Sequence, residues 1–408
     1  MTGRTGPARP TGAHAFPRLD GLRALAAFAV VFTHVGFLTG RTGDNGPFGP
    51  ILARLNFGVT LFFLLSGFLL YRPFVAAALA GRPRPALGRF WLRRGLRIFP
   101  AYWLALAVTL GAGIATTDFS ARDVLAYVTL THTYAGAPDD SALTQMWTLV
   151  TELAFYAVLP LLAVVSLPRG RDPMALLRRQ AVLLAGLVAA TIAYVPVVRA
   201  LTTPENRRAL LWLPAYLDWF ALGMALAVAS CVLASPELAA RCRLGVLNRL
   251  ADDAATCWVI GGLLLWTASL PIAGPLTLVP PTGWEWTAQH GLFGAAAAFF
   301  MLPCVLGGSG GRIRAFLGST PMRRLGTVSY GVYLWHLPLI VVLFRVLDQQ
   351  PFTGGFWRLL GLTAVLATAA ATASYVLVER PVLNLGRGSG SRGSSGSSTP
   401  ARATAQQS

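Results

Sequence analysis

Long apolar runs recur along this chain, from close to its N-terminus almost to its C-terminus. They cover residues 18–37, 56–76, 100–116, 147–166, 180–198, 209–233, 256–271, 288–306, 329–347 and 357–378. Inside a bilayer the backbone must satisfy its own hydrogen bonds, so runs of this length are expected to be helices. With 54% hydrophobic and only 12% charged residues, the composition excludes an ordinary soluble domain. We predict an all-α, polytopic membrane protein of about ten transmembrane helices in one bundle.

The arginines give this bundle an orientation. The net charge is +18, and most of the arginines that cause it lie in every second loop between the apolar runs. If the N-terminus is cytoplasmic, 25 arginines fall in inside segments, eight fall outside and Arg23 lies within the first helix. Because cytoplasmic loops are enriched in basic residues, this predicts ten spans with both termini cytoplasmic, in a multi-pass protein of the cell membrane. The shortest run, 256–271, is the weakest of the ten.

Both ends of the chain differ in composition from the spans. Residues 1–17 are rich in Gly, Pro and Thr, and residues 384–408 are rich in Gly and Ser. Such segments lack the apolar side chains for a core, so we expect two disordered tails around a membrane-embedded domain at 18–383. The longest outside loop, 117–146, has room for a short helix.

The cysteines do not suggest a metal or redox site. Cys231, Cys242, Cys257 and Cys304 show neither CxxC nor metal-ligand spacing. We therefore expect no bound metal.

The first apolar run carries three ionisable residues, Asp20, Arg23 and His34. Ionisable groups within a membrane span are costly and usually mark a functional pathway. Arg23 and His34 are three helical turns apart, about 16 Å, and share nearly one face. This spacing favours a functional site over the alternative, a signal anchor with an isolated histidine.

Two further segments carry polar groups beside the spans. Ser66 and Gly67 are embedded in FFLLSGFLL. Small residues at such a position allow close packing of helices, and we favour this packing role over a role in a functional site. Arg94 and Arg97 in RRGLR are neighbours on a helical surface. Two guanidiniums there can bind phosphate groups or anchor the loop to anionic lipid headgroups, and their spacing does not separate these alternatives.

Glu152 is buried in the run MWTLVTELAFY, with Tyr156 one turn further on. Counting from the expected faces, Glu152 and His34 come to similar depths, so the carboxylate can orient the imidazole as a general base. Pairing of Glu152 with an arginine is the alternative. His336, in SYGVYLWHLP, is equally compatible with a catalytic and an interfacial role.

These segments together resemble the acyltransferase-3 family of integral membrane O-acyltransferases. The resemblance lies in RLDGLRALA with an R-x10-H arrangement at Arg23 and His34, in GVTLFFLLSGFL, in the Arg94 and Arg97 pair, in WTLVTELAFY, and in SYGVYLWH with a later VERP. These motifs run in order from residue 18 to residue 381, which covers almost all of the expected membrane domain.

The resemblance implies transfer of an acyl group, often acetyl, from acyl-CoA to a hydroxyl of a sugar. By that similarity His34 and Arg23 are catalytic, and Arg94 with Arg97 hold the donor. The donor is a substrate, so no tightly bound cofactor is expected. The acceptor is a hydroxylated glycan, a glycolipid or a glycosylated small molecule such as a secondary metabolite, and no nucleic-acid partner is implied.

Two mechanisms remain open on these residues. His34, oriented by Glu152, can act as the general base or can carry the acyl group transiently. A different functional class is also compatible with a buried Arg, His and Glu, namely a transporter or flippase that uses them as a relay. No internal repeat of the kind common in transporters is visible in the sequence, which favours the acyltransferase.

Overall fold

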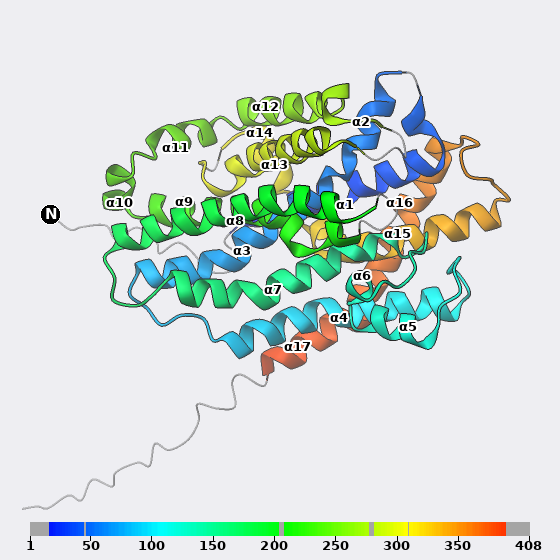
Figure 1. The fold of residues 1–408 in the computed structure, drawn as a ribbon, viewed down its shortest axis with the longest axis horizontal. Helices are drawn as coiled ribbons and strands as arrows, with labels where there is room; N and C mark the ends of the chain where they lie inside the picture. The colour runs from blue at the N-terminus through cyan, green and yellow to red at the C-terminus, as the bar shows by residue number, and fades with distance from the viewer. Residues whose placement is uncertain (1–15, 45, 204–207, 277–280, 309, 389–408) are drawn as a thin grey trace, which may run out of the picture.

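A computed structural model describes residues 16–44, 46–203, 208–276, 281–308 and 310–388. Within these ranges the regular secondary structure is entirely helical, so the all-α prediction is confirmed. The long helices lie roughly along one axis and form one bundle (Figure 1). They are α1 (Pro17–Leu38), α3 (Gly58–Leu79), α4 (Leu87–Gly111), α7 (Trp147–Ser166), α8 (Pro173–Leu201), α9 (Leu217–Leu233), α12 (Ala254–Thr267), α13 (Gly283–Val305), α15 (Thr320–Val346) and α16 (Phe356–Ser374).

Eight helical segments of the described chain are long and apolar enough to cross a membrane, which makes this a multi-pass membrane protein. They contain α1, α3, α7, α8, α9, α13, α15 and α16. The two other expected spans also contain helices. However, α12 is shorter than a typical span, and α4 carries several arginines in its first half. Ten crossings therefore stay a prediction.

Short helices connect these spans, and one more, α17, follows the last span. They are α2 (Phe48–Arg54), α5 (Ala121–Val128), α6 (His132–Ala135), α10 (Pro236–Arg241), α11 (Gly245–Asp252), α14 (Arg312–Leu317) and α17 (Arg380–Gly388). Helices α5 and α6 confirm the short helix expected in loop 117–146. They lie at the end of the bundle opposite α10, as alternation of the loops requires (Figure 1).

The predicted tails fall mainly outside the described residues. Helix α1 already begins at Pro17, and α17 continues from Arg380 to Gly388, beyond the expected domain end at 383. Residues 1–15 and 389–408 lie outside the described ranges, so the disorder expected there stays a prediction.

Helix α1 lies at the centre of the packing and contacts α3, α13, α15 and α16. Its approach to two of these neighbours depends on glycine. A Cβ added at Gly58 would overlap the Ala26 carbonyl oxygen, and one added at Gly326 would overlap that of Asp20. Small residues let backbones in a bilayer approach closely and gain van der Waals contact. This packing encloses α1, so that Arg23 and His34 are partly buried inside the bundle.

Helices α3 and α9 are locked together in the same way. An added Cβ at Gly67 would overlap the Phe220 carbonyl oxygen, and one at Gly223 would overlap that of Leu64. The Phe220 ring stacks on Phe63, with centroids 4.7 Å apart. The packing role expected for the Ser66-Gly67 step is therefore confirmed for Gly67.

Replacing Gly67 by alanine is expected to destabilise the bundle, because the new methyl group meets backbone that cannot rotate away. Overpacking of this kind costs about 1–3 kcal/mol. Thermal unfolding in detergent should show a lower midpoint for Gly67→Ala. Gly186→Ala in α8 is the matched control, because its Cβ would meet nothing within 4 Å. Equal midpoints for both variants would contradict the close packing of α3 and α9.

The loop between α4 and α7 is ordered by buried polar groups. The Asp140 carboxylate accepts hydrogen bonds from the backbone N–H groups of Thr116, Thr117 and Ala142, at 2.6–2.8 Å. Nearby, the His132 ring stacks on Tyr127 with centroids 4.2 Å apart and is only 3% exposed. Burial, and secondarily the Arg208 guanidinium, lower the pKa of His132 to about 4.

This buried histidine should make stability depend on pH. In the unfolded chain His132 takes up a proton near its ordinary pKa of about 6.5, whereas the folded protein does so only near pH 4. Between these values the unfolded state binds more protons. His132 therefore lowers stability as the pH falls from about 6.5 to 4, by at most about 1.4 kcal/mol per pH unit. Thermal midpoints measured across this range should fall less steeply for His132→Gln than for wild type, and parallel curves would refute the assignment.

Candidate active site

Most of the residues singled out in the sequence line one narrow cavity between α1, α3, α4, α7 and α15. We call it the arginine cavity; it has a volume of about 80 Å³. Its lining includes Arg23, Ser66, Arg94, Arg97, Glu152 and Tyr156. The fold thus brings together side chains up to 310 positions apart in the chain, from Arg23 to Tyr333.

The arginine cavity is predominantly positive. Arg94 and Arg97 enter it from α4 and Arg23 enters it from α1, against one lining carboxylate, Glu152. Arg23 also has its own partner, since its Nη1 lies 3.2 Å from Asp20 Oδ1. Guanidiniums in such a setting offer several N–H donors to an anion, and phosphate is the group they match best.

Glu152 is held inside this cavity by hydroxyl groups. Its Oε1 accepts a hydrogen bond from Ser66 Oγ at 2.5 Å and another from Tyr156 Oη. Ser66 therefore has a polar contact in addition to its place beside the packing glycine. The expected contact of Glu152 with His34 is not formed, because the carboxylate points to α3 and to the next turn of its own helix.

His34 is paired with His336 of α15 instead. His34 Nδ1 lies 3.0 Å from His336 Nε2, and His336 Nδ1 lies 2.7 Å from the Tyr333 carbonyl oxygen. A carbonyl can only accept, so His336 Nδ1 carries a hydrogen and, in the neutral ring, its Nε2 is the acceptor. His34 must then donate from Nδ1. This chain of hydrogen bonds leaves the lone pair of His34 on Nε2, the arrangement that a general base requires.

His34 also lines a second and larger cavity of about 230 Å³, which we call the tryptophan cavity. Its aromatic walls are Trp147, Tyr216, Trp219 and Trp286. Val59 and Tyr333 line both cavities, so the two are neighbours across these side chains. His34 therefore lies on the tryptophan cavity, which is separated from the arginine cavity by side chains that line both.

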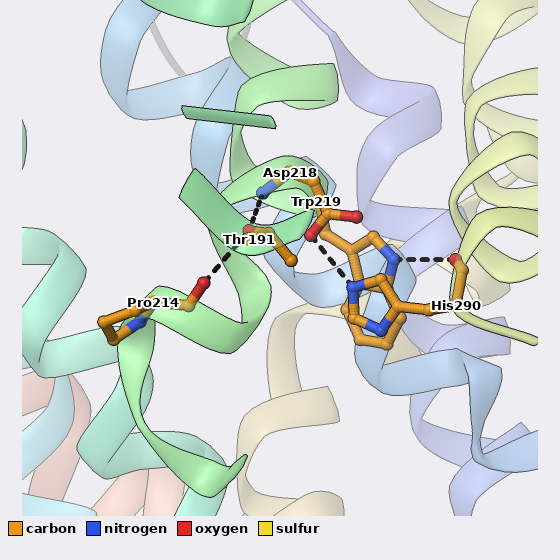
Figure 2. A network of polar contacts seen from close by, with 5 residues as sticks. All are labelled: Thr191, Pro214, Asp218, Trp219 and His290. Carbon is orange, nitrogen blue, oxygen red and sulfur yellow. Dashed lines mark hydrogen bonds and ion pairs between the residues drawn. The ribbon is translucent and has the colours of Figure 1, made fainter. Parts of the chain in front are cut away.

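A second paired histidine, His290, lies on the wall of the tryptophan cavity, and it was missed in the sequence together with its partner Asp218. His290 Nε2 of α13 lies 2.9 Å from Asp218 Oδ1 of α9, and Trp219 Nε1 donates to the His290 carbonyl oxygen at 3.0 Å (Figure 2). Both residues are ionisable groups within apolar runs. The criterion that identified Arg23 and His34 would therefore also have found Asp218 and His290.

Comparison of the sequence with known proteins identifies a family for this chain. The acyltransferase-3 profile, described as an acyltransferase domain, matches residues 16–378. The chain is 26% identical to the peptidoglycan O-acetyltransferase OatA of Listeria monocytogenes over 90% of its own length and 55% of that protein. It is 27% identical to the putative membrane-bound transacylase BcsY of Komagataeibacter xylinus over 90% of its length and 82% of that protein.

A third relative is the putative peptidoglycan O-acetyltransferase YrhL of Bacillus subtilis, at 25% identity over 92% of this chain. The chain spans about 55% of the length of OatA and 56% of YrhL. No solved structure matches it significantly. These matches favour an enzyme over the transporter alternative. Since the family profile covers nearly all of the described chain, the protein belongs to the acyltransferase-3 family of multi-pass membrane acyltransferases.

Proposed function

We propose that this protein transfers an acetyl group from acetyl-CoA to a hydroxyl of a sugar in a cell-envelope glycan, with His34 as the general base. The observation that carries the proposal is the hydrogen-bond chain that leaves the Nε2 lone pair of His34 free on the tryptophan cavity, which shares two wall residues with the arginine cavity. The family and relatives named as O-acetyltransferases support the chemistry.

The donor binds through its phosphates to Arg94 and Arg97. Acetyl-CoA carries several negative charges and is made in the cytoplasm, and the arginine count of the loops leads us to expect the N-terminal end of α4 on that side. The guanidiniums give it charge-assisted, bidentate contacts. From the arginine cavity the thioester needs to pass only the side chains of Val59 and Tyr333 to come near His34.

The reaction follows from the state of the His34 ring. Nε2 takes the proton of the acceptor hydroxyl as its oxygen attacks the acetyl carbonyl, so the new C–O bond forms while the C–S bond breaks. The coenzyme A thiolate leaves and receives the proton back from the imidazolium. His336 stabilises the imidazolium through the Nδ1 hydrogen bond. Glu152, bound by Ser66 and Tyr156, positions the walls of the donor cavity and does not contact the base.

Purified protein in liposomes, given radiolabelled acetyl-CoA, tests the base. His34→Ala should lower coenzyme A release by about 10²- to 10⁴-fold, the usual contribution of a general base. Label should not accumulate on the wild-type protein during turnover. Label on wild type that is absent from His34→Ala would replace the base mechanism with an acyl-histidine carrier. Wild-type protein that is folded but neither binds nor consumes acetyl-CoA would refute the proposed function.

The donor site is tested by Arg94→Ala/Arg97→Ala. Each charge-assisted contact contributes about 1.5–3 kcal/mol, so acetyl-CoA affinity should fall at least tenfold. The matched control is Arg89→Ala/Arg93→Ala, which removes the same charge from exposed positions of the same helix. If the two double variants lose equal affinity, Arg94 and Arg97 act only on lipid headgroups.

His336 is predicted to be a positioning residue. His336→Ala removes one neutral hydrogen bond, worth about 1 kcal/mol, and frees the His34 ring, so kcat should fall by about five- to tenfold. The acetyl-CoA KM should stay unchanged, and the pH dependence of kcat should shift because the partner of Nδ1 is lost. An unchanged pH profile would show that His336 acts only in packing.

A further inference from the structure

The lining of the tryptophan cavity differs in kind from that of the arginine cavity. Three indoles and two phenols are among its lining side chains, and none of its lining residues is an arginine or a carboxylate. Its volume of about 230 Å³ is roughly fifteen times that needed for one water molecule, so a single sugar ring fits. Aromatic faces carry negative charge density and attract the C–H groups on the face of a pyranose ring.

Polar groups are set among these aromatic side chains. Gln145 and Gln289 line the cavity, as does Asn56. Gln145 is only 1% exposed and donates from Nε2 to the Leu334 carbonyl oxygen, while its Oε1 has no protein partner. An unsatisfied buried acceptor costs about 1–3 kcal/mol, and a ligand hydroxyl would satisfy it. Apolar walls with a few fixed polar groups are typical of a small-molecule site.

His290 is part of the same wall and is rigidly held, with Asp218 as its hydrogen-bond partner behind the wall. The His290 imidazole lies between the rings of Trp219 and Trp286, with centroids 3.9 and 4.2 Å away. Asp218 is fixed in turn, because its backbone N–H donates to Thr191 Oγ1 at 3.2 Å (Figure 2). A carboxylate accepts only, so it fixes His290 with the hydrogen on Nε2. The result is a preorganised aromatic surface with a defined polar edge.

We propose that the tryptophan cavity is the acceptor site and takes one pyranose ring of the glycan against Trp286, with a hydroxyl bound by Gln145. Asp218 and His290 are positioning residues that hold this surface. The inference rests on the proposed function, since it is His34 on the same wall that makes a bound hydroxyl reactive. It separates the two substrates in space, with the donor at the arginines and the acceptor at the tryptophans.

The test measures acetyl transfer from labelled acetyl-CoA to two probes, chitotetraose and a soluble peptidoglycan disaccharide. Trp286→Ala and Gln145→Ala should each raise the acceptor KM about tenfold, while the acetyl-CoA KM stays within twofold of wild type. Trp286→Phe, which keeps an aromatic face, should recover most of the loss. Trp284→Ala, two residues earlier and 69% exposed, is the matched control.

Binding of the same probes without acetyl-CoA separates this inference from the proposed function. Both probes should change the tryptophan fluorescence of wild type, and this change should be lost in Trp286→Ala. His290→Ala should weaken probe binding, and His290→Gln should restore part of it. Coenzyme A release without probe binding would overturn the acceptor site and leave the proposed function standing. Probe binding without any acetyl-CoA turnover would keep the sugar site and refute the reaction.

Discussion

The hydrogen bond between His34 and His336 is the interaction on which the proposed chemistry depends. In the interior of a membrane bundle an imidazole has no water to fix its tautomer, so its protein partner does so. Here the Tyr333 carbonyl oxygen sets the state of His336, and His336 sets that of His34. The residues that hold this chain lie on two helices, α1 and α15, whose close approach depends on Gly326.

The two cavities on either side of Tyr333 suit the two different substrates of an acyl transfer. One carries three arginines and matches a polyanion, whereas the other is walled by indoles and matches a sugar. With His34 as the proposed base on the second cavity, each substrate is recognised by its own chemistry. No guanidinium lines the cavity that contains His34. The positive charges of the arginines therefore do not oppose protonation of the His34 ring at close range.

Sequence patterns predicted the helical class, the positions of the long helices and all four charged residues that line the arginine cavity. These predictions succeeded because the length of an apolar run and the spacing of residues along a helix can each be read from a single segment of the sequence. The partner predicted for His34 was wrong. Which neighbour an imidazole contacts depends on the rotation of α7 and α15 about their axes, and the sequence does not give that rotation. Depth alone allowed Glu152, but Ser66 and Tyr156 already bind that carboxylate. Asp218 and His290 were missed although their burial in apolar runs was visible.

The tautomer of His34 is the most direct test of this account, and solid-state ¹⁵N NMR of histidine-labelled protein in lipid bilayers can measure it. The His34 signals can be assigned by difference with His34→Gln. We predict that His34 has a protonated Nδ1 and an unprotonated Nε2 in the resting enzyme at neutral pH. A His34 ring with its proton on Nε2 would contradict it, because that ring could not accept the proton of an acceptor hydroxyl from the cavity.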